Sequence, residues 1–184
     1  MKTKITYAAI FGLIGIASQL ISFLLGFQTD KIGTPAATIF GMVIWFVSLV
    51  LGFVVVWLGL RAVRDEKPDQ CLTYGQGVGA GVIIVLIAAV ISAVYLIIHL
   101  ALINPGFVEN TLAVTREKWA AMGMPDEQMQ MAEKIMRVTM HPAIMALMGF
   151  FWNMVIGTII SLIAAAIVKR NPQPQFAAQV PPAL

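Results

Sequence analysis

The sequence contains few charged residues. Only 11% of its 184 residues are charged, whereas 59% are hydrophobic. A soluble domain carries roughly a quarter charged residues and about half apolar ones. Here the apolar residues fall in continuous blocks rather than alternating with polar ones, which excludes an ordinary water-soluble core. The net charge of +3 is too small to indicate nucleic-acid binding.

Cysteine is nearly absent as well. The single Cys71 excludes an intramolecular disulfide and a structural zinc site built from several thiolates. One thiol beside a polar loop is compatible with a reducing compartment.

Four long segments contain no Asp, Glu, Lys or Arg. They are Ile5–Phe27, Ala36–Leu60, Tyr74–Ile103 and Ala143–Val168. A hydrocarbon core of about 30 Å needs roughly 20 apolar residues in a helix, and all four segments are long enough. The sequence therefore predicts an all-α membrane protein, an antiparallel bundle of four transmembrane helices. The first apolar run is longer than the hydrophobic region of a signal peptide, which is usually about 7–15 residues, so we expect this run to be retained.

Basic residues in short loops predict the orientation, because they favour the cytoplasmic side. The 28–35 loop has one, Lys31, whereas the opposite side has seven: Lys2, Lys4, Arg61, Arg64, Lys67, Lys169 and Arg170. We therefore expect both termini in the cytoplasm and residues 104–142 in the periplasm, with the protein in a bacterial inner membrane.

The segment between the third and fourth spans predicts a helical hairpin over about 105–141. Pro105 ends the third span, Gly123 interrupts the helical pattern and Pro125 restarts it. Apolar residues recur at helical spacing on both arms: Val108, Leu112, Thr115, Trp119 and Met122, then Met129, Ala132, Met136 and Met140. We expect an amphipathic hairpin on the membrane surface or over the bundle, with Trp119 as an interfacial anchor.

These elements define one membrane domain over residues 1–170. The Pro- and Gln-rich residues 171–184 are typical of a disordered tail.

Several short motifs occur in an order and spacing that are similar to a known family. They are LTYGQG from Leu72, INPGF from Ile103, GMPDEQ from Gly123 and GTIISLIAAAI from Gly157. Over about residues 5–171 the chain resembles the DUF4199 family of bacterial membrane proteins, whose function is unassigned. The resemblance implies a four-helix inner-membrane protein and supplies no catalytic residues.

Glycines give the clearest candidate contact surface. Gly75, Gly77, Gly79 and Gly81 open the third span, and Gly157 lies in the fourth. Small residues four apart let a neighbouring helix approach closely in lipid, so we interpret these glycines as helix-packing residues. A phosphate-binding loop is less favoured, because no strand precedes the glycines and no acidic residue follows at the required distance.

Reactive groups are few. A methionine-rich stretch over 122–148 includes the Cu(I)-ligand candidates Met129, Met131 and His141. Packing or surface adhesion is the favoured interpretation of these methionines, and an apolar ligand or partner is a further alternative. His99 is interpreted as a hydrogen-bonded interfacial imidazole, and Gln19 and Asn153 as groups that bond across helices. Nothing in the pattern predicts a catalytic site or a cofactor.

The leading hypothesis is therefore a non-enzymatic accessory or scaffold subunit, surrounded by membrane lipid, that packs against a second copy or another membrane protein. The alternative is a protein that binds or transports a lipid or small apolar molecule, with the methionine-rich hairpin as its lid. A Cu(I)-binding protein is the third possibility.

Overall fold

The computed structural model describes residues 1–170, and the predicted disordered tail over 171–184 lies outside them. Its helices are α1 (Lys2–Leu24), α2 (Pro35–Asp65), α3 (Tyr74–Ile98), a π-helical turn η1 (His99–Ile103), α4 (Phe107–Ala121), α5 (Asp126–Thr139) and α6 (Pro142–Val168). α1, α2, α3 with η1, and α6 are long and apolar enough to cross a membrane. The all-α class and the four apolar spans are therefore confirmed, and they define a membrane-spanning protein.

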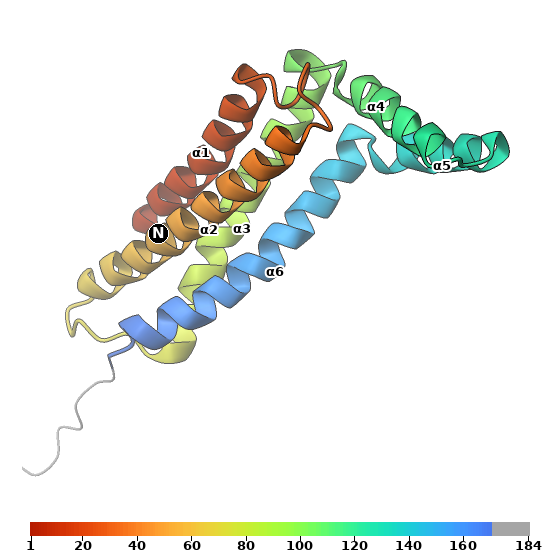
Figure 1. The fold of residues 1–184 in the computed structure, drawn as a ribbon. Helices are drawn as coiled ribbons and strands as arrows, with labels where there is room; N and C mark the ends of the chain where they lie inside the picture. The colour runs from red at the N-terminus through yellow and green to blue at the C-terminus, as the bar shows by residue number, and fades with distance from the viewer. Residues whose placement is uncertain (171–184) are drawn as a thin grey trace, which may run out of the picture.

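The four long helices run side by side, and each runs opposite to the one before it (Figure 1). α3 is the central helix and packs chiefly against α6 and α1, while α2 packs against α1 and α6. We call the end that carries Lys2, Lys67 and Lys169 the basic end, and the end at α4 and α5 the hairpin end.

Local sequence signals explain where the spans begin and end. The Thr34 side chain accepts a hydrogen bond from Ala37 N at 3.2 Å, and Pro35 occupies the first turn of α2. Thr73 and Gln76 form a capping box at the start of α3. α2 continues to Asp65, past the predicted end at Leu60, because charged residues end a membrane span without ending its helix.

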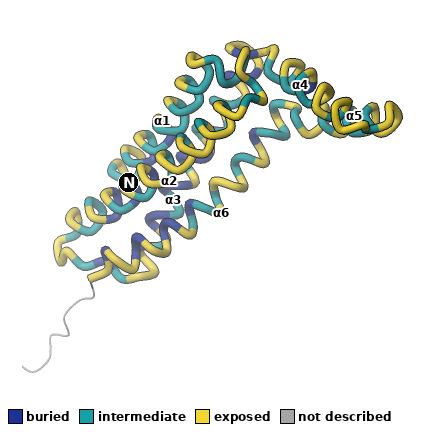
Figure 2. The backbone as a smooth tube through the Cα atoms, viewed as in Figure 1, coloured by how far each residue is buried: buried dark blue, intermediate teal, exposed yellow. Residues whose placement is uncertain are grey.

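Packing is tight at the basic end and open toward the hairpin end. The buried residues of α2 all lie between Gly52 and Leu60, and those of α6 lie between Gly157 and Val168 with the exception of Ala146. Figure 2 shows buried backbone concentrated in the same half of the bundle. The four helices are therefore closely packed at the basic end, and α2 and α6 diverge from there toward the hairpin end.

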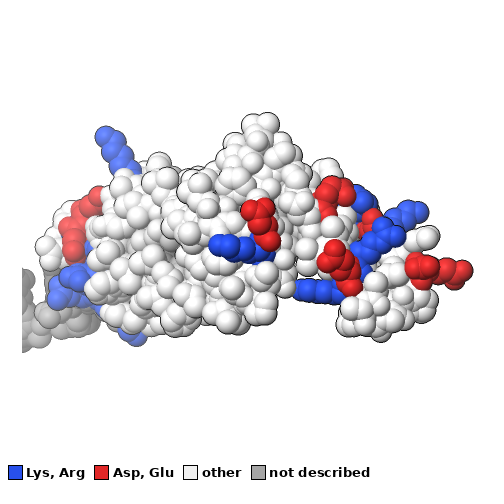
Figure 3. All heavy atoms as spheres, turned by 45° about the horizontal axis from the view of Figure 1, so that its top comes forward, with Lys and Arg blue, Asp and Glu red and all other residues white. Residues whose placement is uncertain are grey.

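The α4–α5 hairpin projects sideways from its end of the bundle (Figure 1). Leu112 is its one buried residue, and the predicted inner face of α5 is half-buried against α4 at Met129, Ala132 and Met136. Charged residues gather over the hairpin and at the opposite end of the molecule (Figure 3). Lys118 Nζ donates to Gly33 O at 3.0 Å and so ties α4 to the α1–α2 loop.

Candidate functional site

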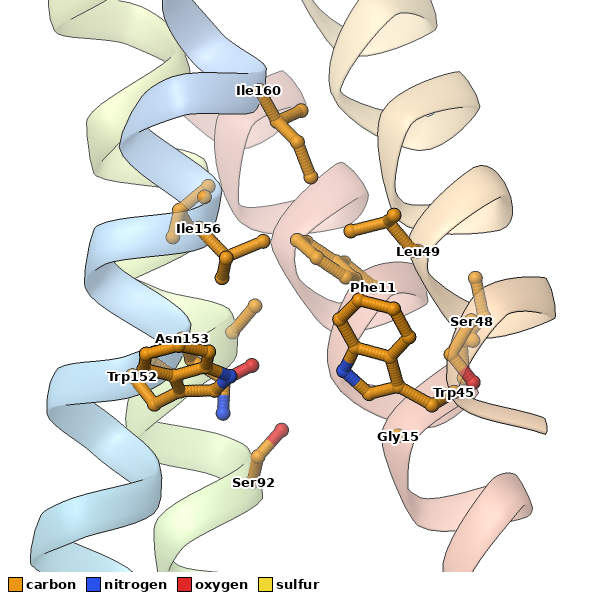
Figure 4. A pocket seen from close by; sticks show the side chains of 15 residues that line it. Phe11, Gly15, Trp45, Ser48, Leu49, Ser92, Trp152, Asn153, Ile156 and Ile160 are labelled. Carbon is orange, nitrogen blue, oxygen red and sulfur yellow. The ribbon is translucent and has the colours of Figure 1, made fainter. Parts of the chain in front are cut away.

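A cleft of about 120 Å³ lies where α2 and α6 diverge. All four long helices line it, and Trp45 of α2 and Trp152 of α6 stand on opposite sides of the gap (Figure 4). The two indole side chains are 53% and 60% exposed, so the cleft opens sideways toward the surroundings of the bundle. Its deeper walls are apolar: Phe11, Leu49, Val85, Ala88, Ala89, Ile156 and Ile160.

A second cavity of about 190 Å³, the annex, adjoins the cleft toward the hairpin end. Gly15, Ser92 and Asn153 line both cavities, so the two spaces meet at these residues. The annex is the more polar of the two, because Gln19 and Tyr95 also contribute to its wall. A mostly apolar space with a few polar groups on its wall is the usual composition of a pocket for an organic ligand.

Ser92 differs from the other Ser and Thr residues of the four spans. Each of the others makes a hydrogen bond, in most cases to the carbonyl one turn earlier: Thr3, Thr6, Ser18, Ser22, Thr38, Ser48, Thr158 and Ser161. Within residues 1–170 no hydrogen bond of the Ser92 hydroxyl is found, and Ser92 lines both cavities. Gly15 of α1 packs close to this hydroxyl, since a methyl group on Gly15 would lie 3.3 Å from Ser92 Oγ.

The side-chain amide of Asn153 uses only part of its hydrogen-bonding capacity. Its Nδ2 donates to Gly149 O of the same helix at 2.8 Å, so it does not bond across helices as the sequence suggested. The amide has a second N–H and a carbonyl oxygen that remain available on the cavity side.

A network of hydrogen bonds holds two of the residues that line the annex. His99 is fully buried, with Nε2 2.9 Å from Gln28 Oε1 and Nδ1 3.2 Å from the Tyr95 hydroxyl. Gln28 Nε2 donates to Gln19 Oε1 at 2.9 Å, and Asn104 Nδ2 donates to Gln28 O at 3.1 Å. The network joins the α1–α2 loop to η1 and holds Gln19 and Tyr95 in the annex wall. His99 is thus hydrogen-bonded as expected, but it lies in the interior rather than at an interface.

Neutral side chains line both cavities. No Asp, Glu, Lys, Arg or His lines either one in the described part of the chain. Among residues 1–170 no group of three or more His, Cys, Asp and Glu side chains is arranged to hold a metal ion. The walls offer apolar contact and a few neutral hydrogen-bonding groups.

The predicted packing glycines fall into two sets. Gly77 and Gly81 face α6, where added methyl groups would lie 3.0 Å from Ala165 Cβ and 2.6 Å from Ser161 Oγ. Gly157 lies in the same contact, directly against the Val85 side chain. Gly75 and Gly79 point into open space, with no atom of the described residues within 4 Å of an added methyl group.

The copper candidates lie on different elements or on different sides of one helix. Met129 is half-buried, whereas Met131 is 69% exposed, because residues two apart in a helix lie about 200° apart around its axis. His141 begins α6, where its Nδ1 accepts from Ala143 N at 3.4 Å. The geometry gives the copper hypothesis no support.

The hairpin contributes no lining residue to either cavity, so its expected role as a lid stays a prediction. The hairpin projects to one side of the bundle, and Trp119 is half-buried on α4. The cleft between Trp45 and Trp152 was not predicted from the sequence. Two tryptophans on separate helices carry no sequence signal that they will face each other.

Taken together, the fold and the cavities define a helical membrane-spanning protein with a laterally open cleft between two of its spans. The family model described as "Protein of unknown function (DUF4199)" matches residues 6–170. The chain therefore belongs to the DUF4199 family. No curated protein and no solved structure matches it.

Proposed function

We propose that this protein is a non-enzymatic membrane protein that binds a lipophilic molecule in the cleft between α2 and α6. The observation that carries the proposal is the position of the cleft, which opens between two spans and not at either end of the bundle. Around such an opening the solvent is lipid, so a ligand enters sideways from the bilayer.

The packing of the bundle supports a preformed cleft. Val56, Leu60 and Ala164 are completely buried at the basic end, which fixes the spacing of the helices there. The Ser18 and Ser48 hydroxyls lie 2.9 Å apart and join α1 to α2 beside the cleft. Close packing at the basic end and this hydrogen bond between helices hold the cleft walls in place. Few side chains of the cleft therefore need to become ordered when a ligand binds.

Quantitative lipid extraction from gently purified protein tests this function. Ile156 lines the cleft, and Ile156→Trp should fill it and reduce a bound lipophile severalfold. Val155→Trp is the matched control, because Val155 is 54% exposed and outside the lining. Equal amounts of bound molecules in both variants and in the parent chain would refute the proposal.

Association through α3 is a second candidate function. Gly75 and Gly79 form a small-residue pair on one exposed helix face that no other span of the chain covers. A second copy or another membrane protein could approach the α3 backbone closely there. Gly75→Leu with Gly79→Leu should abolish crosslinked oligomers in native membranes, whereas Gly41→Leu, at an equally open position of α2, should not. Unchanged crosslinking in the double variant would remove this candidate.

The proposed setting is a bacterial inner membrane with the basic end in the cytoplasm and the hairpin in the periplasm. The uneven distribution of Lys and Arg in the short connections supports this orientation. In a Cys71→Ser background, Lys67→Cys and Lys134→Cys should react with an impermeant maleimide on opposite sides of the membrane. The orientation is reversed if intact cells label Lys67→Cys and spare Lys134→Cys.

A further inference from the structure

We infer that the cleft and the annex together take a long-chain lipophile whose head group is an uncharged oxygen, a hydroxyl or a carbonyl. The head group lies at Ser92 and Asn153, and the chain lies along the apolar walls of the cleft. This inference rests on the proposed function and specifies the chemical class of its ligand.

The first argument is the unused hydrogen-bonding capacity at the junction of the two cavities. Ser92 Oγ lies at that junction, and the structure gives it no protein partner in residues 1–170. Ser92 is half-buried and its hydroxyl is open to the cavities, so it is free to hydrogen-bond to a group placed there. A ligand oxygen in the junction would use this capacity, and this ties the head group to Ser92.

The second argument is the kind of hydrogen bond that the annex offers. Gln19 Oε1 is engaged by Gln28, which leaves the Gln19 amide N–H groups as donors in the annex wall. Asn153 keeps one N–H donor and its carbonyl acceptor, and Ser92 can both donate and accept. An oxygen that accepts hydrogen bonds therefore finds three donors, and a hydroxyl proton finds the Asn153 carbonyl.

The third argument is the absence of charge. No cationic side chain lines either cavity in the described residues, so a carboxylate or phosphate would have no counter-charge. Both ring nitrogens of His99, which lies behind the annex, are already within hydrogen-bonding distance of Gln28 and Tyr95. Placing an unpaired anion in low dielectric is far more costly than placing a neutral oxygen there. The structure therefore disfavours fatty acids and phospholipid head groups.

The fourth argument is the order in which polar and apolar groups follow one another along the two cavities. From Ser92 the cleft runs past the two indole rings toward Leu49, Ile156 and Ile160, which are wholly apolar (Figure 4). The annex lies on the other side of the same junction. A molecule with one polar end and one long apolar end matches this order.

Photolabelling of the full chain in phosphatidylcholine nanodiscs tests the inference. The probe is octadecanol with a diazirine in its chain, and labelled peptides are mapped by mass spectrometry. We expect saturable labelling of the α2 and α6 peptides that contain Trp45 and Trp152. Unlabelled octadecanol and octadecan-2-one should compete, whereas stearate and octadecane should need at least tenfold higher concentrations.

Two variants sharpen the test. Ser92→Ala should weaken octadecanol binding roughly tenfold, the equivalent of one hydrogen bond. Ser22→Ala is the matched control, because its hydroxyl bonds to Ser18 O outside both cavities and its loss should change nothing.

The outcomes separate the two proposals. If no saturable labelling occurs, the proposed function itself fails. If labelling is saturable but stearate or octadecane competes as well as octadecanol, the cleft binds a lipophile and the head-group inference is wrong. Full binding by Ser92→Ala would also overturn the inference while the proposed function stands.

Discussion

Gly81 of α3 lies so close to Ser161 of α6 that a methyl group on the glycine would lie 2.6 Å from the serine hydroxyl oxygen. Ser161 is completely buried, and its hydroxyl already donates to Gly157 O at 2.7 Å, so it cannot move aside easily. The absence of a side chain at Gly81 therefore sets the distance between the two helices. Since α6 forms one wall of the cleft, this contact also helps to fix the width of the cleft.

Gly81→Ala should therefore destabilise the protein. Overpacking a tight contact costs about 1–3 kcal/mol, and thermal unfolding in detergent should show the loss. Gly79→Ala is the matched control two residues away, because an added methyl group there meets no atom of the described residues within 4 Å. Equal stability of the two variants would show that α3 and α6 do not pack as described.

The His99 network gives a second prediction. Gln28→Leu removes the partner of His99 Nε2, of Gln19 Oε1 and of no other side-chain atom. The buried His99 Nε2 and the half-buried Gln19 Oε1 then lose their partner, and the free energy of unfolding should fall by roughly 1–3 kcal/mol, chiefly because of His99. Asp30→Asn in the same loop should have little effect. If Gln28→Leu unfolds like the parent chain, His99 is satisfied in some other way.

Ser92 and Ser48 should respond in opposite ways when each is replaced by alanine. Ser48→Ala removes the 2.9 Å contact with Ser18 and should cost about 0.5–1.5 kcal/mol. Ser92→Ala removes a hydroxyl without a partner in the described chain, so stability in the absence of ligand should be unchanged or slightly higher. A clear loss of stability in Ser92→Ala would mean that its hydroxyl is structural.

The pairing of α4 with α5 should weaken in acid. Glu109 accepts from Arg137 Nη2 at 3.0 Å, and this guanidinium lowers the pKa of the Glu109 carboxyl. A lowered pKa means that the contribution is complete above the ordinary glutamate value of about 4.3 and is lost as the pH falls through the lower, folded value. The contact between α4 and α5 should therefore weaken as the pH falls below the ordinary glutamate value, whereas between pH 5 and 8 it should keep its geometry.

Spin labels at Ala113→Cys and Gln128→Cys, in a Cys71→Ser background, would measure the distance between the two arms. Glu109→Gln should remove most of the acid-dependent change, whereas Glu117→Gln should leave it intact. A distance distribution that is the same at pH 3 and pH 7 in the parent chain would contradict the role of this ion pair.

The sequence predicts the elements of this fold well, because the rules for spans and helix breaks are local. Four charge-free stretches identify the long helices, and Pro105, Gly123 and Pro125 locate the bends around α4 and α5. The end of α2 was placed at Leu60, because a hydropathy pattern reports where lipid ends and not where a helix ends. The π-helical turn at His99 has no comparable signal.

The candidate site could not be predicted, because it depends on which helices are neighbours. The spacing of Gly75, Gly77, Gly79 and Gly81 indicates two small faces on α3, but it does not show which one α6 covers. Likewise, Trp45 and Trp152 lie more than one hundred positions apart. Only the divergence of α2 from α6 makes them the walls of one cleft.

Fluorine NMR of protein labelled with 5-fluorotryptophan tests the central claim most directly, because two of the four tryptophans line the cleft and the other two serve as internal controls. Trp45 and Trp152 line the cleft, whereas Trp57 and Trp119 do not. On titration with octadecanol in nanodiscs, the resonances of Trp45 and Trp152 should shift saturably while those of Trp57 and Trp119 stay in place. Resonances that do not move, or four resonances that drift together without saturation, would contradict a binding cleft between α2 and α6.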